Sequence, residues 1–258
     1  MFELSLIGVG AGDPEHLTLQ AARALNAADL VLIPRKGAEK ADLADLRRAI
    51  CAAVLTNPAT VLAEFDLPTR DETIADYAAR VALWHDAIAE AWVATLRAHP
   101  GARRGALLVW GDPSLYDSTL RIAQRVGRLL PLRVSVIPGV TAIQALAAAH
   151  AIPLNEVGAP VLITTGRRLR RDGWPPCADT LVVMLDGDCA FRALDPGGVR
   201  IWWGAYLGMA HQILMAGALA EVGADILAAR AAARARHGWI MDTYILRRAA
   251  PPPRTAAP

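Results

Sequence analysis

The sequence has few of the features that mark secreted, membrane-spanning or metal-binding proteins. Its three cysteines, Cys51, Cys177 and Cys189, lie far apart, with no C-x-x-C pair and no histidine at metal-ligand spacing. Neither a disulfide framework nor a bound metal is therefore expected. No run approaches the roughly 20 apolar residues that a membrane span requires. The N-terminus, MFELSLIGVGAGD, lacks the basic segment and cleavage site of a signal peptide, so we expect a cytoplasmic protein with no membrane contact.

An excess of charge of one sign is also missing. The chain has 27 Lys and Arg residues against 25 Asp and Glu residues, which gives a formal charge of +2 over 258 residues. Because non-specific nucleic-acid binding needs a basic surface, this balance argues against a nucleic-acid partner. Apolar residues, in contrast, make up 54% of the chain, which is enough for a sizeable buried core.

Short apolar runs that end at Gly, Pro or Asp alternate with long segments rich in alanine and leucine. This alternation is typical of βα units with parallel strands, so the predicted fold class is α/β. Residues 1–153 are predicted to form a first, doubly wound domain. Its expected strands are 4–8, 30–33, 60–63, 106–110 and 133–137, and its expected helices are 17–27, 39–54, 72–98, 116–130 and 140–149.

A second, smaller α/β domain is predicted over residues 154–248. Its expected elements are strands near 160–165, 180–185 and 199–203, a long helix near 211–235 and a last strand near 239–247. The tail, 249–258, contains three consecutive prolines and small residues, which predicts disorder. Ligands of open α/β proteins bind at the carboxyl ends of the strands, so a cofactor cleft is expected between the two domains.

Three glycine-containing segments each follow a predicted strand: GVGAGDP from Gly8, WGDPSLY from Trp110 and VIPGVTA from Val136. Glycine permits tight turns and lets a ligand approach the backbone, although each segment alone is also explained as a simple turn. The first segment lacks the third glycine of the dinucleotide fingerprint, which disfavours a nicotinamide-dependent oxidoreductase. Three such turns together favour a ligand site, and a non-catalytic binding module stays open as an alternative.

The segments GVGAGDPEHLTLQAARAL, WGDPSLY and VIPGVTAIQALAA resemble, in order and separation, the three signature segments of the tetrapyrrole (corrin/porphyrin) methyltransferases. The resemblance covers most of the chain and implies S-adenosylmethionine as cofactor, a tetrapyrrole substrate and a homodimer. The family usually has proline where this chain has Ala11, so Ala11 is not an expected contact. The resemblance implies cofactor contacts from Gly10, Trp110, Gly111, Asp112, Leu115, Thr141, Ala142, Met184 and Ala205.

Further segments, PRKGAEKADL, WHD and WIMDTY, are similar to family members that act on the corrin ring in cobalamin biosynthesis. This similarity implies methylation of carbon C-1 of precorrin-5 with loss of an acetyl group. Another precorrin methyltransferase of the same fold stays open, as does a relative that methylates protein or RNA, such as diphthine synthase.

Methyl transfer from a sulfonium depends on orientation in a dry pocket more than on a strong base. Loss of an acetyl group adds the need for a base that activates water and for donors to the developing oxyanion. The candidate catalytic residues are Asp112, Tyr116 and His16, with His150 as a further candidate. The sequence does not rank them, and no Ser-His-Asp arrangement is recognisable.

A substrate with many carboxylates needs guanidinium or ammonium donors near the site. The candidate substrate-binding residues are Arg35, Lys36, Arg167 and Arg168. The last two belong to an arginine run that is predicted to form a loop after a strand, and solvent exposure explains such a run equally well.

An aromatic stripe is expected on the helix at 72–98. Tyr77, Val81, Trp84, Ile88 and Trp92 lie at helical spacing, which predicts core packing rather than a ring-stacking site. The neighbouring His85 and Asp86 are interpreted as structural helix residues.

Overall fold

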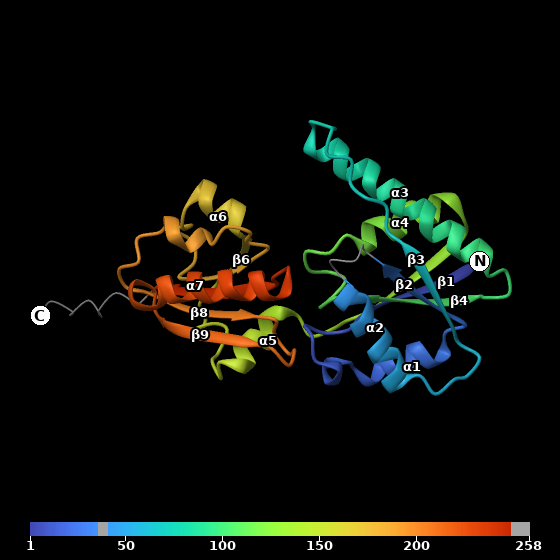
Figure 1. The fold of residues 1–258 in the computed structure, drawn as a ribbon, viewed down its shortest axis with the longest axis horizontal. Coiled ribbons are helices and arrows are strands. Elements are labelled where there is room, and N and C mark those ends of the chain that lie inside the picture. The colour runs from blue at the N-terminus through green and yellow to red at the C-terminus, as the bar shows by residue number, and fades with distance from the viewer. Residues whose placement is uncertain (36–40, 249–258) are drawn as a thin grey trace, which may run out of the picture. The chain divides into compact units, whose positions relative to one another are not determined.

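The computed structural model of the chain describes residues 1–35 and 41–248 (Figure 1). Contacts within it define two compact units, of which unit 1 is Met1–Thr141 and unit 2 begins at Ala142. Lys36 and the predicted disordered tail lie outside the described residues.

The boundary between the units lies before helix α5 (Ala142–Ala149), whereas the sequence analysis places it after this helix, at 153/154. Helix α5 contacts β8 (Val199–Ala205) and β10 (Asp242–Arg248) of the second sheet. The approach is close, because a Cβ added at Gly204 would lie 2.7 Å from Cδ1 of Leu146. This packing groups α5 with unit 2.

Unit 1 is built on a five-stranded parallel sheet with strand order β3-β2-β4-β1-β5. All five predicted strands are present, which confirms the α/β class. Their bounds are β1 (Phe2–Gly8), β2 (Leu30–Arg35), β3 (Val61–Asp66), β4 (Arg104–Val109) and β5 (Leu132–Ile137).

Helices cover both faces of this sheet (Figure 1). One face packs on α1 (Leu19–Ala27) and α2 (Ala41–Val54), and the other packs on α3 (Tyr77–Ala98) and α4 (Thr119–Leu129). Successive residues of β4 enter opposite cores, with Leu107 on the α3 and α4 side and Leu108 on the α1 and α2 side. A strand buried on both faces explains the continuous apolar run at this position.

The chain connections reverse direction around β4. Helices α1 and α2 carry the chain from β1 toward β3, and α3 and α4 carry it back over the other face toward β5. Strand β4 lies between β2 and β1. The connections that leave β2 and β1 cross one face of the sheet, and the connection that leaves β4 crosses the other face. Ligands of open α/β sheets bind at the carboxyl ends of strands where connections diverge in this way. Unit 1 offers two such places, one on each side of β4.

The predicted aromatic stripe on helix α3 is only partly buried in the core. Ile88 and Trp92 are buried, as expected, but Tyr77 at the start of the helix is 49% exposed. His85 is buried, and this burial, with Arg125 nearby, lowers the pKa of its imidazole. Asp86 forms an ion pair with Arg125 at 2.6 Å. The structure therefore gives His85 and Asp86 positions within the α3 and α4 packing.

Unit 2 contains a mixed five-stranded sheet of order β6-β7-β10-β8-β9, in which β6 and β7 are parallel and the other pairs antiparallel. Helices α6 and α7 pack on one face around the buried Trp203 and Tyr244, and α5 lies on the other face (Figure 1). The bounds not yet given are β6 (Val161–Thr165), α6 (Gly166–Asp172), β7 (Thr180–Met184), β9 (Ile213–Ala218) and α7 (Leu219–His237).

The predicted helix at 211–235 is wrong in its first part, because β9 occupies Ile213–Ala218 and α7 begins at Leu219. Alanine and leucine favour a helix locally, but this segment pairs with β8 from Ile213 opposite Ala205 to Ala218 opposite Arg200. Pairing with the preceding strand outweighs the local propensity. The last strand, predicted from 239, begins at Asp242.

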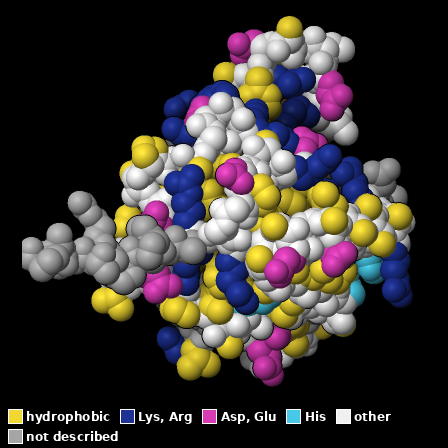
Figure 2. All heavy atoms as spheres, turned by 90° about the vertical axis from the view of Figure 1, so that its left-hand side faces the viewer, with side chains coloured by type: hydrophobic (Ala, Val, Ile, Leu, Met, Phe, Trp, Pro, Cys, Tyr) yellow, Lys and Arg dark blue, Asp and Glu magenta, His cyan; other side chains and the backbone are white. Residues whose placement is uncertain are grey.

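Charged side chains of both signs are interspersed over the face shown in Figure 2. Ion pairs of Arg48 with Glu64 and of Arg104 with Asp29 show the same mixing in unit 1. Among the described helices, none is long and apolar enough to cross a membrane.

Candidate functional site

The carboxyl ends of β1, β4 and β5 meet through backbone alone. A Cβ added at Gly8 would lie 2.6 Å from the nitrogen of Gly139 and 2.7 Å from the oxygen of Gly111. A Cβ added at Gly139 would lie 2.2 Å from the same Gly111 oxygen. Because no side chain fits, close approach of the strand ends requires glycine here. The three segments that the sequence analysis singled out are therefore brought together within unit 1, and we call this the glycine edge.

Gly10 and Gly111 join the first two segments by an isolated β-bridge. The N–H of Gly111 donates to the oxygen of Gly10 at 2.8 Å, and the N–H of Gly10 donates to the oxygen of Gly111 at 3.3 Å. Both glycines have positive φ, +87° and +63°. A Cβ added at Gly111 would meet only Cα of Thr141, at 4.0 Å. The space beside Gly111 is therefore open to a ligand, next to Thr141.

Asp112 is buried, and its carboxylate accepts hydrogen bonds from the turns of the glycine edge. Its Oδ1 accepts from the N–H of Ser114 at 2.8 Å and from the Ser114 hydroxyl, and its Oδ2 accepts from the N–H of Gly139 at 2.9 Å. Burial opposes ionisation, but these hydrogen bonds outweigh it and hold the pKa of Asp112 below its ordinary value. A carboxylate held ionised by three donors positions the turn, and this geometry does not favour a role as base.

His16 and Tyr116, the other candidate catalytic residues, lie in the same turns. His16 ends the short 3-10 helix Pro14–His16, and its Nδ1 accepts from the N–H of Ala11 at 3.4 Å. Its Cβ leaves no room for a side chain at Gly10, so His16 braces the first turn. Tyr116 is 44% exposed and has φ +49°. Catalytic roles for both residues stay predictions.

His150 forms a hydrogen bond within unit 2. Its Nε2 lies 3.0 Å from the carbonyl oxygen of Trp203. A carbonyl oxygen only accepts hydrogen bonds, so Nε2 carries a proton in this contact. The contact ties the end of α5 to β8 and accounts for this histidine structurally.

Two predicted cofactor contacts of unit 2 share one edge of its sheet. Met184 ends β7 and Ala205 ends β8, and both strands run antiparallel to β10, which lies between them. Asp242 at the start of β10 pairs with Ala205. Met184 and Ala205 therefore lie at the same carboxyl edge, with Asp242 between their strands.

Strained turns follow these strand ends, and no sequence pattern predicted them. Leu185 and Tyr206, the residues directly after β7 and β8, both have φ +52°. Left-handed backbone at a bulky residue is costly and concentrates at functional sites, and Leu185 is also 66% exposed. Tyr116 shows the same strain in unit 1. No sequence signal marks such turns, because neither leucine nor tyrosine favours positive φ.

Two of the candidate substrate-binding arginines, Arg35 and Arg168, are engaged by carboxylates of the chain itself. Arg35 donates through Nε and Nη2 to the two carboxylate oxygens of Asp66, both at 2.9 Å. Arg168 forms an ion pair with Asp172 at 3.3 Å. The predicted loop around Arg167 and Arg168 is wrong, because both residues lie in α6, whose N-terminus is capped by Thr165. Binding of substrate carboxylates by these residues stays a prediction.

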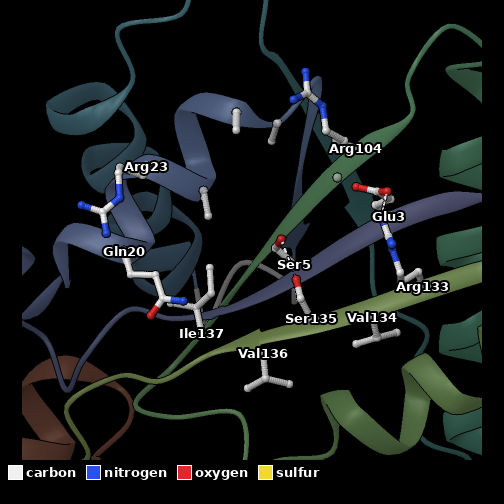
Figure 3. A pocket seen from close by; sticks show the side chains of 14 residues that line it. Glu3, Ser5, Gln20, Arg23, Arg104, Arg133, Val134, Ser135, Val136 and Ile137 are labelled. Carbon is white, nitrogen blue, oxygen red and sulfur yellow. Dashed lines mark hydrogen bonds and ion pairs between the residues drawn. The ribbon is translucent and has the colours of Figure 1, made fainter.

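A hollow of unit 1 lies elsewhere, along β1, β5 and α1, and has a volume of about 500 Å³ (Figure 3). Its side chains partly satisfy one another, since Glu3 forms an ion pair with Arg133, and the hydroxyls of Ser5 and Ser135 lie 3.0 Å apart. None of the predicted site residues that the structure describes lines this hollow. Trp110, in contrast, lines a smaller cavity of about 180 Å³ next to the glycine edge.

Known proteins share both the sequence and the fold. The family model of the tetrapyrrole (corrin/porphyrin) methylases matches residues 3–223. A precorrin-6A synthase [deacetylating] from Sinorhizobium sp is 49% identical over 253 residues, which are 97% of each chain. The crystal structure of a cobalamin synthesis related protein (CobF) from Corynebacterium diphtheriae is 39% identical, with a TM-score of 0.82 over 96% of this chain and 99% of that one.

A more distant structure shares the fold alone. It is a uroporphyrin-III C-methyl transferase from Thermus thermophilus complexed with S-adenyl homocysteine, 22% identical over 95% of this chain and 92% of that one, with a TM-score of 0.57. The family match spans most of the chain and includes all three segments of the glycine edge. This chain therefore belongs to the tetrapyrrole (corrin/porphyrin) methylase family.

Proposed function

We propose that this chain is a deacetylating precorrin-6A synthase, which methylates C-1 of precorrin-5 with S-adenosylmethionine and releases acetate to give precorrin-6A. The observation that carries the proposal is the near full-length likeness to the relative of that name. Membership of the methylase family supports the reaction class.

The glycine edge of unit 1 fits the proposed cofactor. The backbone of Gly111 faces open space, and Gly10, Asp112 and Thr141 surround it. S-adenosylmethionine, when bound, supplies the methyl group as a sulfonium. The proposed cofactor contacts are Gly10, Trp110, Gly111, Asp112, Leu115 and Thr141 in unit 1, and Ala142, Met184 and Ala205 in unit 2.

The chain's own task is to orient and to exclude water, since no strong base is needed for methyl transfer itself. Asp112 serves this task as a positioning residue, because its hydrogen bond to the Gly139 N–H ties the β4 turn to the β5 turn. Removal of the acetyl group needs other residues, with an available base and with donors to an oxyanion.

The test is to incubate the protein with precorrin-5 and S-adenosylmethionine labelled in its methyl group. We expect one labelled methyl on the ring and one acetate per turnover, by mass spectrometry and acetate assay. Methylated ring without acetate would contradict the deacetylating activity and leave another precorrin methyltransferase. Activity on protein or RNA, with none on precorrins, would favour the relatives that modify those substrates.

The proposal includes a homodimer in the cytoplasm. Light scattering of the eluting protein during size-exclusion chromatography measures the subunit number. A mass of one chain would contradict the dimer and leave the proposed reaction untouched.

A further inference from the structure

The two sides of β4 differ at the carboxyl edge. On the β1 side, pairing continues to Gly8 opposite Val109. On the β2 side, pairing stops at Leu32 opposite Leu107, although β2 itself continues to Arg35 alongside β3. Strands β2 and β4 therefore splay apart at one of the two places where the chain connections diverge, and this is where ligands bind in open α/β sheets.

A cavity of about 180 Å³ lies at this splay, and we call it the tryptophan cavity. Arg47 of α2 reaches into the gap, where its Nε donates to the carbonyl oxygen of Leu108 at 3.0 Å. Trp110 connects the cavity to the glycine edge, because it directly precedes Gly111. The residues of the lining that matter here are Arg47, Trp84, Trp92, Trp110 and Asp117.

The lining of the tryptophan cavity includes hydrogen-bond donors that have no acceptor among the described residues. The indole N–H groups of Trp92 and Trp110 are buried and have no hydrogen-bond partner among the described residues. Trp92 is only 2% exposed, so its N–H is shielded from bulk solvent. Burial lowers the pKa of Arg47 to about 10, with Asp117 opposing the shift, and the guanidinium therefore remains a cation at neutral pH. Buried donors without acceptors call for an explanation, and a ligand group with an acceptor oxygen would supply one.

We propose that the tryptophan cavity receives the acetyl group of the substrate, with Trp92, Trp110 and Arg47 as donors to its carbonyl oxygen and Asp117 as the base. The inference rests on the proposed deacetylating function. The cavity volume corresponds to roughly six water molecules, which is enough for an acetyl group and a water but not for the macrocycle. Asp117 and Arg47 balance each other's charge, which favours a neutral acyl group over a carboxylate.

The step balances in atoms and electrons. Asp117 takes one proton from water, and the resulting hydroxide adds to the acetyl carbonyl, whose oxygen becomes an oxyanion held by the donors. The bond between the ring carbon and the carbonyl carbon then breaks. Its electron pair stays on the ring carbon, which becomes the nucleophile that methylation requires. Acetic acid leaves with the other proton of the water, and Asp117 releases its proton to solvent.

Indole resonances test the cavity without any turnover. The chain has seven tryptophans, so nitrogen-15 labelling gives seven indole N–H signals, which Trp→Phe variants assign. We expect acetamide, a neutral acyl probe, to shift the signals of Trp92 and Trp110 but not that of Trp174, whose N–H donates to the Ala178 oxygen at 2.8 Å. Arg47→Met should abolish the shifts. Shifts with acetate and propionate but not with acetamide, or no shifts at all, would overturn the acyl assignment.

Kinetics test the roles of the residues. Trp92→Phe should slow acetate release about 100-fold, as loss of an oxyanion donor does, while binding of S-adenosylhomocysteine stays unchanged. Asp117→Asn should slow the same step, and Trp174→Phe, which removes an indole N–H that is not part of the cavity lining, should not. Equal slowing by Trp92→Phe and Trp174→Phe would overturn the donor role. If the parent protein releases no acetate, the proposed function fails, and the acetamide titration still decides whether the cavity binds an acyl group.

Discussion

The two sides of β4 carry residues of opposite size at the carboxyl edge of the sheet. Toward β1 and β5 the strand ends approach so closely that Gly8 and Gly139 leave no room for a Cβ. Toward β2 the strands splay, and large side chains such as Trp110 and Arg47 surround a cavity. The first side exposes backbone, which suits a cofactor held by main-chain groups. The second side presents side-chain donors, which suit a chemical step. One strand end thus combines a rigid edge with a lined cavity.

The largest expected effect is on the closed side. Gly139→Ala places a Cβ 2.2 Å from the Gly111 oxygen, and because both partners are backbone, neither can rotate away. We expect the free energy of unfolding to fall by about 3 kcal/mol, measured by urea denaturation, and S-adenosylhomocysteine binding to be lost. The matched control is Gly101→Ala, which has open space around it and should not lose stability. Equal losses in both variants would contradict the close-approach argument.

This closed side is also the part of the site that the sequence predicted best. A strand followed by a glycine turn is a local pattern, and three such patterns at strands one, four and five must meet at one sheet edge once the strands are parallel. The splay toward β2 has no local signal, because it depends on where the pairing of two distant strands ends. Arg47 and Asp117 therefore escaped notice, and Trp92 was interpreted only as core.

Asp112→Ala should have the next largest effect. It removes the acceptor for three donors and leaves the partly buried N–H of Gly139 without its partner. We expect a loss of about 2 kcal/mol in the free energy of unfolding, together with weaker binding of S-adenosylhomocysteine by isothermal titration calorimetry. Ser114→Ala keeps the carboxylate and should lose less. A stable Asp112→Ala protein with parental cofactor affinity would remove Asp112 from the positioning role.

Arg47→Met tests the open side in the same way. The change keeps much of the side-chain volume but removes the hydrogen bond to the Leu108 oxygen, so we expect a loss of about 1.5 kcal/mol by urea denaturation. Arg48→Met on the same helix breaks exposed ion pairs with Asp45 and Glu64 and should cost less, because solvent screens such pairs. A larger loss in Arg48→Met would show that the guanidinium of Arg47 does not hold the splayed strand.

Unit 2 shows a further limit of prediction from sequence. The segment Ile213–Ala218 has the composition of the helix that follows it, and only the free edge of β8 makes it a strand. The strained turns at Leu185 and Tyr206 likewise depend on the strands that they leave. The predicted contacts Met184 and Ala205 directly precede these two turns, and the resemblance that indicated these residues gave no sign of the strain that follows them.

The smallest expected effect is a pH dependence that separates the two sides of β4. Hydrogen bonds lower the pKa of Asp112 in the folded protein below the ordinary carboxyl value of 3.8. A carboxyl whose pKa is lower in the folded than in the unfolded protein stabilises the fold at pH values above its pKa in the unfolded protein. This stabilisation is lost as the pH falls through the pKa of the folded protein. The asparagine in Asp112→Asn does not titrate in this range. The difference in the free energy of unfolding between parent and variant should therefore be largest near pH 6 and should shrink by less than about 1 kcal/mol toward pH 3.

Urea denaturation of both proteins at the two pH values measures this difference, and titration of the other carboxylates cancels in the subtraction. Arg47→Met serves as the comparison from the open side, because a guanidinium whose pKa is about 10 keeps its charge throughout this range. Its stability difference from the parent should therefore stay constant between the two pH values. If the Asp112→Asn difference also stays constant, the hydrogen bonds at the glycine edge do not depend on the charge of Asp112. In that case the two sides of β4 differ in packing alone.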